Sequence, residues 1–290
     1  MDWTYKNLYE WGVQQLKQAE IPEAELDARL LLESVCKTDR NTLLVHGQRE
    51  VSPEEYECYV NYIEERKTRK PLQYITGEQE FMGLPFFVNE NVLIPRQDTE
   101  ILVEEAMRRL HDGMHILDMC TGSGCILLSL LYYSNDCSGL GVDISDKALQ
   151  TARQNAERIR TLKKEIDVTF IQSNLFENLA DNEEYAGAFE MIVSNPPYIQ
   201  SHVIDTLMPE VGQYEPRLAL DGKEDGLYFY RLIIEQAGKY LAGGGELFFE
   251  IGCDQGCDVK KMMEEAGYKE VEVIKDFAGL DRVVCGILPR

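Results

Sequence analysis

The sequence predicts an α/β protein in which a mostly parallel, doubly wound sheet follows a small N-terminal helical domain. From residue 115 onward, short apolar runs typical of strands alternate with amphipathic helical patterns, and this alternation is typical of a parallel sheet with helices on both faces. Before residue 71 only helical periodicity occurs. The chain has 290 residues, of which 44% are hydrophobic, so it is long enough for one large domain or two unequal ones.

Residues 1–70 predict a helical bundle. Ser52, followed by Pro53 and by Glu55 three positions on, forms a capping box with proline at the first helical position. Apolar residues recur at helical spacing in two segments, namely Ala24, Ala28, Leu31, Leu32 and Val35, and Tyr56, Tyr59, Val60 and Ile63. We interpret both stripes as core packing.

Residues 71–97 predict a hairpin-like linker. Pro71 ends the helical region, and glycine and proline interrupt the stretch that follows. Two runs within it, 86–88 and 92–94, have strand character. We expect the next helix to begin near Asp98, whose carboxylate would cap it, and to reach about Leu110.

The remaining elements follow from apolar runs and capping signals. We expect strands at 115–119, 140–142, 168–172, 191–194 and 246–251, and helices at 125–133, 146–160, 226–240 and 255–266. Ser145 is the expected N-cap of the second of these helices. Two final runs, 270–274 and 283–288, predict a closing antiparallel pair.

Charge limits the partners that the chain can have. The formal net charge is −22, which argues against direct binding to duplex DNA because such binding needs a surface rich in lysine and arginine. The acidity fits either a basic partner or solubility alone. The first residues do not resemble a signal peptide, and the longest apolar run, Ile126–Tyr133, is too short to span a bilayer. We therefore expect a cytoplasmic protein without membrane association.

The cysteine pattern predicts reduced thiols. Eight cysteines are scattered along the chain: Cys36, Cys58, Cys120, Cys125, Cys137, Cys253, Cys257 and Cys285. Such spacing in a large chain favours a cytoplasmic protein over a disulfide framework. Cys253 and Cys257 could lie one helical turn apart, but no second pair or histidine accompanies them, so we expect no metal site.

The first functional motif is the run Asp118-Met-Cys-Thr-Gly-Ser-Gly124, which joins a predicted strand to a helix. Its glycines allow close approach of a ligand to the backbone, and Asp143 follows about 20 residues later, as a ribose-binding acid does in dinucleotide folds. Leu127 stands where a dinucleotide site would have its third glycine. Asp118 would repel a pyrophosphate but suits the ammonium group of a methionine moiety. The motif favours S-adenosylmethionine over NAD, and a purely structural turn remains the alternative.

The second motif, Asn195-Pro-Pro-Tyr198, follows the fourth predicted strand, where ligands bind in open α/β sheets. The Asn195 side-chain oxygen and the Pro196 carbonyl are two acceptors that match the two hydrogens of a planar NH₂ group. Tyr198 offers a flat face to a planar amide or base. In isolation the motif would be an ordinary turn, but its position at this edge favours a functional site.

These motifs resemble those of a known family. Asn-Pro-Pro-Tyr after a glycine-rich strand–helix turn is the hallmark of class I methyltransferases that act on amide or amino nitrogens. Further matching runs are Pro71–Gly77, Ile94–Glu100, Tyr214–Leu220, Asp225–Leu227, Lys275–Asp276 and Gly279–Arg282. Across nearly all 290 residues, the chain resembles the protein-(glutamine-N5) methyltransferases of the PrmC/HemK type.

The resemblance implies a Rossmann-like methyltransferase domain at 98–290 with a mostly parallel seven-stranded sheet, a linker at 71–97 and a substrate-recognition domain at 1–70. It implies methyl transfer from S-adenosylmethionine to the glutamine of the Gly-Gly-Gln motif in class I peptide chain release factors, and we expect a monomer. The implied cofactor residues are Asp118, Cys120, Thr121, Gly122, Ser123, Gly124, Asp143, Asn174 and Asn195. The implied substrate residues are Asn195, Pro196, Pro197 and Tyr198, of which Asn195, Pro196 and Tyr198 are also the implied catalytic residues.

Two positions depart from the family pattern. Cys120 stands where many members have glycine, which a small side chain tolerates if φ is negative. Asn174 occupies a position often held by aspartate, where the family usually contacts the adenine. The expected mechanism is orientation of the amide by two acceptors without a strong base, and no motif surrounds any of the four histidines.

Two other functions remain open from the sequence. A nucleic-acid adenine-N6 methyltransferase also acts on a planar NH₂ group, but it would need a basic recognition region. The run Arg66–Lys70 is the one local candidate, and we interpret it as a solvated helix end. The second alternative is a non-catalytic module that binds the cofactor and a partner, against which the intact Asn-Pro-Pro-Tyr run argues.

Overall fold

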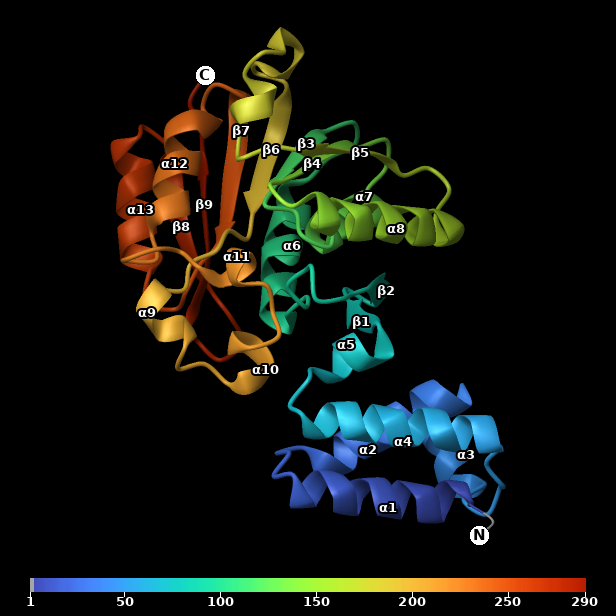
Figure 1. Ribbon diagram of the computed structural model, residues 1–290. Helices are drawn as coiled ribbons and strands as arrows, with labels where there is room; N and C mark the ends of the chain where they lie inside the picture. Colours follow the sequence, from blue (N-terminus) through green and yellow to red (C-terminus); the bar gives the residue numbers. More distant parts are fainter. Residues whose placement is uncertain (1–2) are drawn as a thin grey trace. The chain divides into compact units, whose positions relative to one another are not determined.

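The computed structural model describes residues 3–290, and the chain divides into two compact units (Figure 1). The first comprises the residues up to Gly77 together with Met208–Tyr214, and the second comprises Glu78–Leu207 and Glu215–Arg290. The first unit therefore extends beyond Lys70 and includes a short segment from much later in the chain. No helix in the described part is both long enough and apolar enough to cross a membrane.

The first unit is a helical bundle. It contains α1 (Tyr5–Gln18), α2 (Ala24–Cys36), α3 (Arg40–Val45), α4 (Pro53–Lys67) and α5 (Leu72–Thr76). The predicted capping box is confirmed at the start of α4, where the Ser52 hydroxyl accepts from the Glu55 amide at 3.1 Å and the Glu55 carboxylate accepts from the Ser52 amide at 2.8 Å. The predicted stripes supply the core through Leu31, Tyr59 and other buried residues, and Ile75 of α5 joins it.

The basic run at the end of α4 differs from the expectation. Arg66 is buried, with only 8% of its side chain exposed, because Asp27 accepts from its Nε at 2.8 Å and Glu210 from its Nη2 at 3.1 Å. Arg69 also pairs with Glu210, at 2.9 Å. These pairs attach α10 (Pro209–Gly212) to the bundle. The interpretation of this run as a solvated helix end is wrong for Arg66, and its arginines are committed to carboxylates rather than to phosphates.

The linker contains one hairpin. Strands β1 (Glu78–Phe81) and β2 (Leu84–Phe87) pair antiparallel around Met82 and Gly83. The expected strand at 92–94 is wrong: this segment has irregular backbone, and its apolar character reflects burial of Val92 and Ile94. Helix α6 (Gln97–Arg109) begins after Arg96.

Asp98 does not cap α6. It lies inside the first helical turn, where an acid is favourable near the helix N-terminus, and pairs with Arg282 at 3.1 Å. The expectation that Asp98 caps this helix is therefore wrong, because a residue inside the first turn cannot be the flanking cap.

The second unit is built on the predicted mostly parallel sheet of seven strands. In chain order these are β3 (His115–Met119), β4 (Ser138–Asp143), β5 (Asp167–Gln172), β6 (Phe189–Ser194), β7 (Leu241–Glu250), β8 (Lys269–Lys275) and β9 (Asp281–Ile287). Their spatial order is β5-β4-β3-β6-β7-β9-β8, with only β9 antiparallel to its neighbours. The order reverses between β3 and β6, and ligands bind at such a switch point outside the carboxyl ends of the strands.

Helices cover both faces of the sheet (Figure 1). Helices α6, α7 (Cys125–Tyr133) and α8 (Asp146–Leu162) pack on one face, and α12 (Tyr228–Ala237) and α13 (Gly256–Glu265) pack on the other. The Ser145 hydroxyl caps α8 as predicted. The shorter elements are the 3₁₀ helices η1 (Glu177–Leu179) and η2 (Glu183–Tyr185), and helices α9 (Ser201–Ile204) and α11 (Arg217–Leu220).

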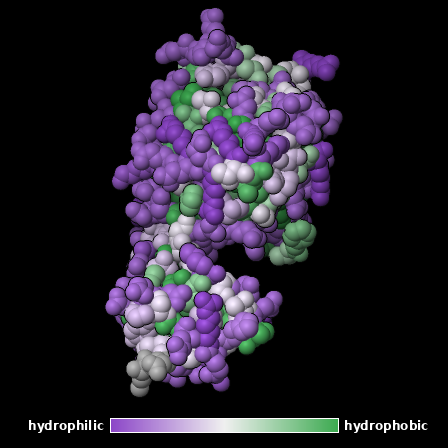
Figure 2. Space-filling model, turned by 90° about the vertical axis from the view of Figure 1, so that its right-hand side faces the viewer, coloured by the Kyte–Doolittle hydropathy of each residue, from purple (hydrophilic) through white to green (hydrophobic). Residues whose placement is uncertain are grey.

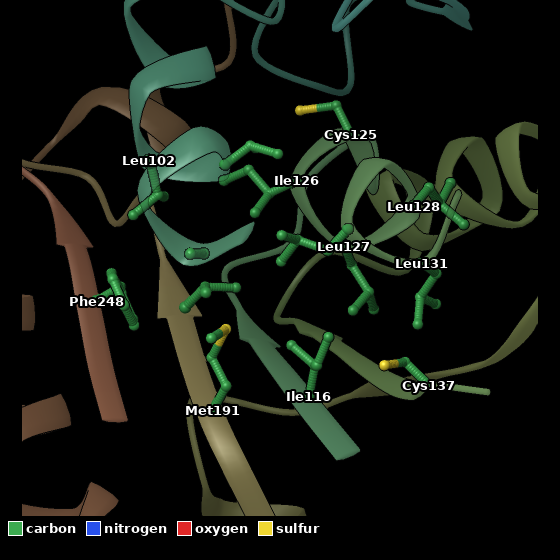
Figure 3. Packing of buried hydrophobic residues seen from close by; sticks show 14 of the residues in the cluster. Leu102, Ile116, Cys125, Ile126, Leu127, Leu128, Leu131, Cys137, Met191 and Phe248 are labelled. Atoms are coloured by element: carbon green, nitrogen blue, oxygen red, sulfur yellow. The ribbon is translucent and has the colours of Figure 1, made fainter. Parts of the chain in front are cut away.

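Figure 3 shows how α7 contributes to the core: Ile126, Leu127 and Leu131 point toward Ile116 and Met191 of the sheet. The packing is tight, since a Cβ added at Gly139 of β4 would lie 2.6 Å from Leu127. The outer surface contrasts with this core, because Figure 2 shows a mostly hydrophilic face with hydrophobic side chains in small, separate groups.

Candidate active site

A pocket of about 390 Å³ lies at the carboxyl edge of the sheet, beside the ends of β3, β4 and β6. This volume is in the range of small-molecule and cofactor sites. Of the predicted site residues, those that line it are Cys120, Thr121, Gly122, Ser123, Asp143, Asn174, Asn195 and Pro197. Asp118, Gly124, Pro196 and Tyr198 do not line it, but each is adjacent in the chain to a residue that does.

Asp118 lies at the base of the glycine-rich turn and is fully buried. Its Oδ2 accepts a hydrogen bond from the Thr121 hydroxyl at 2.6 Å, whereas its Oδ1 is buried with no partner among the described residues. Burial raises the pKa of Asp118 to about 7, although the Thr121 hydrogen bond opposes the shift. An unpaired buried carboxylate oxygen is costly, and a cationic group of a ligand would stabilise its charged form.

The turn itself differs from the expectation at one residue. Cys120 has φ +64°, in the left-handed region, so the negative φ under which a small side chain would be tolerated there is not found. Gly122 and Gly124 also have positive φ, and a Cβ at Gly124 would approach Leu128 to 3.1 Å and Ala152 to 3.3 Å. A non-glycine residue in this region costs about 1–2 kcal/mol. Three of the five residues 120–124 have positive φ, and they turn the chain sharply from β3 into α7.

Asp143 ends β4 and faces the same turn. Its Oδ2 accepts from the Gly122 amide at 2.9 Å, and its Oδ1 accepts from the Ser145 amide at 2.9 Å. Burial raises the pKa of Asp143, and these backbone hydrogen bonds oppose the shift. Each carboxylate oxygen can accept a further bond, so the side chain is fixed in position and still able to bind a hydroxyl group.

Asn174 follows β5 at the pocket wall. Its side-chain amide donates to the Glu177 carboxylate at 2.6 Å, which fixes the NH₂ end and leaves the Asn174 oxygen as the available acceptor. The side chain is exposed.

The Asn-Pro-Pro-Tyr segment lies beside the turn. The register pairs Met119 of β3 with Ser194 of β6, and the Ser194 hydroxyl donates to the Met119 carbonyl at 2.6 Å. The residues that directly follow β3 and β6 are Cys120 and Asn195, respectively. The sheet therefore brings the two sequence motifs together at one edge.

Polar contacts hold Tyr198 at both ends. Its hydroxyl donates to Glu250 at 3.2 Å, and its carbonyl accepts from the Gln255 side chain at 3.1 Å. Two glycines allow neighbouring backbone to approach: an added Cβ would lie 2.6 Å from the Tyr198 Cα at Gly222 and 2.4 Å from the Tyr198 carbonyl at Gly226. The segment 222–226 thus packs directly against the backbone of the Asn-Pro-Pro-Tyr motif. This close approach is a structural reason for the glycine in the Asp-Gly-Leu run at 225–227.

Sequence reasoning from the residues alone missed several polar residues around the pocket. Arg96 lines it and forms an ion pair with the buried Glu215. Thr99 accepts from the Asn195 amide at 3.4 Å, and Glu250 accepts from Tyr198. Arg96, Thr99 and Glu215 lie in the runs 94–100 and 214–220, which were identified only through the family resemblance. The signal for Glu250 was an acid at the end of an apolar strand, the pattern also seen at Asp143.

The pocket offers acceptors and carboxylates rather than a metal centre. Among the described residues, no group of three histidine, cysteine, aspartate or glutamate side chains could hold a metal ion. Cys253 and Cys257 are both exposed thiols. None of the residues that line the pocket is a histidine, so proton abstraction by imidazole has no geometric support here.

Comparisons with known proteins cover nearly the whole chain and agree on one family. Residues 7–77 match the PrmC N-terminal domain family, and residues 110–279 match a family described as methyltransferase domain. The chain is 41% identical to the release factor glutamine methyltransferase of Geobacter sulfurreducens over 98% of this chain and 96% of that protein. It is also 41% identical to the Fusobacterium nucleatum protein of the same name, over 96% of this chain and 77% of that one.

A solved structure supports the fold. A methyltransferase from Pyrococcus furiosus superposes with a TM-score of 0.52 at 16% identity, covering 72% of this chain and 91% of that one. At this identity the likeness concerns the fold only, which is the predicted class I methyltransferase fold.

Proposed function

This chain belongs to the release factor glutamine methyltransferases, and from that premise we propose that it methylates the side-chain amide N5 of the glutamine in the Gly-Gly-Gln motif of class I peptide chain release factors. The methyl donor would be S-adenosylmethionine. The observation that carries the proposal is the adjacency of the glycine-rich turn and the Asn-Pro-Pro-Tyr segment, which follow paired positions of β3 and β6.

The pocket residues fit this cofactor. Asp118 Oδ1 is buried without a partner among the described residues, while Oδ2 accepts from Thr121 of the turn. The negative charge of this carboxylate would favour the ammonium group of the methionine moiety. Asp143 would accept from the ribose hydroxyls, and the Asn174 oxygen would accept from the adenine amino group. Residues 120–124 would pass close to the methionine moiety, with Asn195 at the junction between cofactor and substrate. When bound, S-adenosylmethionine supplies a methyl group made electrophilic by its sulfonium centre.

The chain's own residues would position the nucleophile. An amide nitrogen is a poor nucleophile because its lone pair is delocalised. The Asn195 oxygen and the Pro196 carbonyl would accept both amide hydrogens, with Pro197 fixing the backbone between them and Tyr198. These dipoles are set in place before the reaction and stabilise positive charge that develops on nitrogen. The proton would then pass to water, which agrees with a pocket not lined by histidine.

The helical unit would recognise the protein substrate. Its residues include no candidate for the chemistry, whereas the residues that line the pocket all come from the second unit. One glutamine side chain is too small to select one protein from many, so binding energy must come from remote contacts. Under this proposal, a short Gly-Gly-Gln peptide should be a far poorer substrate than an intact release factor, measured as kcat/KM. Equal values for peptide and protein would contradict a recognition role for this unit.

The decisive experiment is direct. The protein is incubated with isotope-labelled S-adenosylmethionine and a purified release factor, and the label is mapped by mass spectrometry. We expect one methyl group on the glutamine of the Gly-Gly-Gln motif. Label on any other residue, or none on the release factor while adenine in DNA accepts methyl groups, would refute the proposal.

A further inference from the structure

A buried glutamate lies directly behind the Asn-Pro-Pro-Tyr segment. Glu250 is the last residue of β7, which lies beside β6 (Figure 1). The register pairs Ser194 of β6 with Phe249 of β7. The next residues along the two parallel strands are therefore Asn195 and Glu250, so the fold places this acid next to the segment that would bind the substrate.

Its environment makes an acid unexpected. Only 2% of Glu250 is exposed, and burial of a carboxylate costs free energy unless it is paired. An apolar residue of similar volume at such a position is often neutral or stabilising. Stability of the fold therefore does not explain a glutamate at this position. The relevant property is the effect of its charge on neighbouring groups.

One hydrogen bond and two nearby polar groups stabilise its charge. The Tyr198 hydroxyl donates to Glu250 Oε1 at 3.2 Å. Arg282 is close enough for its charge to act on Glu250, and its own side chain is 11% exposed and held by Asp98 and Asp276 at 3.1 Å each. The Thr99 hydroxyl is the second of these nearby groups. Burial raises the pKa of Glu250, and Thr99, Arg282 and Tyr198 each oppose that shift and so favour the carboxylate.

The Thr99 hydroxyl connects Glu250 to Asn195. A hydroxyl carries one proton, and an ionised carboxylate can only accept. Glu250 Oε2 is buried and takes no fully formed hydrogen bond among the described residues, so the rotatable Thr99 hydroxyl is the donor at hand. Thr99 Oγ1 then has only lone pairs left for Asn195, and it accepts from Asn195 Nδ2 at 3.4 Å. The Asn195 oxygen is consequently directed away from Thr99.

We propose that Glu250 is a positioning residue that sets the direction of this hydrogen-bond chain, so that Asn195 presents its side-chain oxygen, and not its NH₂ group, to the substrate amide. The same carboxylate holds the Tyr198 ring through its hydroxyl. The inference rests on the proposed function for its substrate, but the orientation of Asn195 is a property of the protein alone.

The substitution Glu250→Gln tests the direction because it keeps the shape and removes the charge. A glutamine amide can donate to Thr99, whose hydroxyl can then donate to Asn195, and the Asn195 amide would turn over. Glu246→Gln is the matched control: like Glu250, Glu246 lies on β7 and does not line the pocket, but its partner is Arg109 at 2.8 Å rather than Tyr198.

We expect Glu250→Gln to lower kcat on the release factor by about 100-fold, the size of effect caused by a misplacement of about 1 Å in an active site. KM for the release factor and Kd for S-adenosylmethionine should change little, because neither binding surface is removed. A merely structural role would instead lower the melting temperature and both affinities. Wild-type kcat from Glu250→Gln, or an equal loss from Glu246→Gln, would overturn the inference.

A second readout does not require activity. The side-chain NH₂ resonances of Asn195, identified by their loss in Asn195→Ala, should shift in Glu250→Gln and stay unchanged in Glu246→Gln. Unchanged Asn195 resonances in Glu250→Gln would overturn the inference even if the wild-type enzyme did not methylate a release factor. Failure of the wild-type reaction would refute the proposed function instead, so the two failures are distinguishable.

Discussion

The substitution Asp118→Asn should have opposite effects on the cofactor-free protein and on cofactor binding. In the wild type, burial raises the pKa of this carboxyl from its ordinary 3.8 to about 7. The cost of ionising it inside the fold corresponds to roughly 4 kcal/mol, at 1.36 kcal/mol for each pKa step. Because the folded-state pKa is raised, the cofactor-free wild type should lose stability as pH rises from about 4 to about 7. The neutral asparagine would not carry this cost.

Cofactor binding should respond in the other direction. The negative charge of Asp118 would be neutralised by the ammonium group of the ligand, and a hydrogen bond to a charged group contributes about 1.5–3 kcal/mol. Loss of that contribution corresponds to roughly 10- to 150-fold weaker binding. Wild-type affinity should rise as pH approaches 7 and fall above about 8, where an α-amino group loses its proton.

The assay combines calorimetry with thermal denaturation between pH 5 and 9. We expect Asp118→Asn to bind S-adenosylmethionine weakly, with the rise toward pH 7 removed, while its cofactor-free melting temperature at pH 7 equals or exceeds that of the wild type. An unchanged Kd would show that Asp118 does not act on the ligand. If Asp118→Asn instead lowered the cofactor-free melting temperature strongly and left the pH dependence of cofactor binding unchanged, the hydrogen bond between Asp118 and Thr121 would be structural. The charge of Asp118 would then play no part in binding.

Three further substitutions test the site. Asn195→Ala should still bind the cofactor in calorimetry but lose about 2.7–4 kcal/mol of transition-state stabilisation, as when one oxyanion-hole donor is removed; unchanged turnover would contradict the orientation mechanism. Asp143→Ala should weaken cofactor binding by about 1.5–3 kcal/mol, and a wild-type Kd would contradict its ribose contact. Cys120→Gly should relieve about 1–2 kcal/mol of strain at φ +64°, partly offset by the greater unfolded-state entropy of glycine; a lower melting temperature would contradict this account.

Most of the sheet could be predicted because buried parallel strands have a distinct composition. The runs ending at Met119 and Ser194 are short, apolar and mostly buried. Their predicted ends agree with the structure, as does the predicted end of the edge strand β5 at Gln172. The position of β9 between β7 and β8 was not predictable. Strand order depends on contacts between distant segments, and a hydrophobic pattern reports only that a run is buried.

The errors arose where burial or tertiary contacts replaced the local rule. Val92 and Ile94 are apolar because they are buried in irregular backbone, which periodicity cannot distinguish from a strand in so short a run. Asp98 pairs with Arg282, far away in the sequence. Cys120 keeps a positive φ because the turn between β3 and α7 requires it, and the surrounding fold supplies the free energy that this residue type costs there.

The same rule that identified Asp143 also explains why Glu250 was overlooked. An acid that ends an apolar strand in a doubly wound sheet lies at the ligand-binding edge, and its burial must be offset by a partner or used by a ligand. Asp143 has two backbone amides and faces the pocket. Glu250 has Tyr198 and a nearby arginine and lies one layer behind the pocket. The position of an acid at a strand end thus predicts that it acts at the site, whereas only the three-dimensional structure distinguishes an acid that contacts a ligand from one that orients the residues that do.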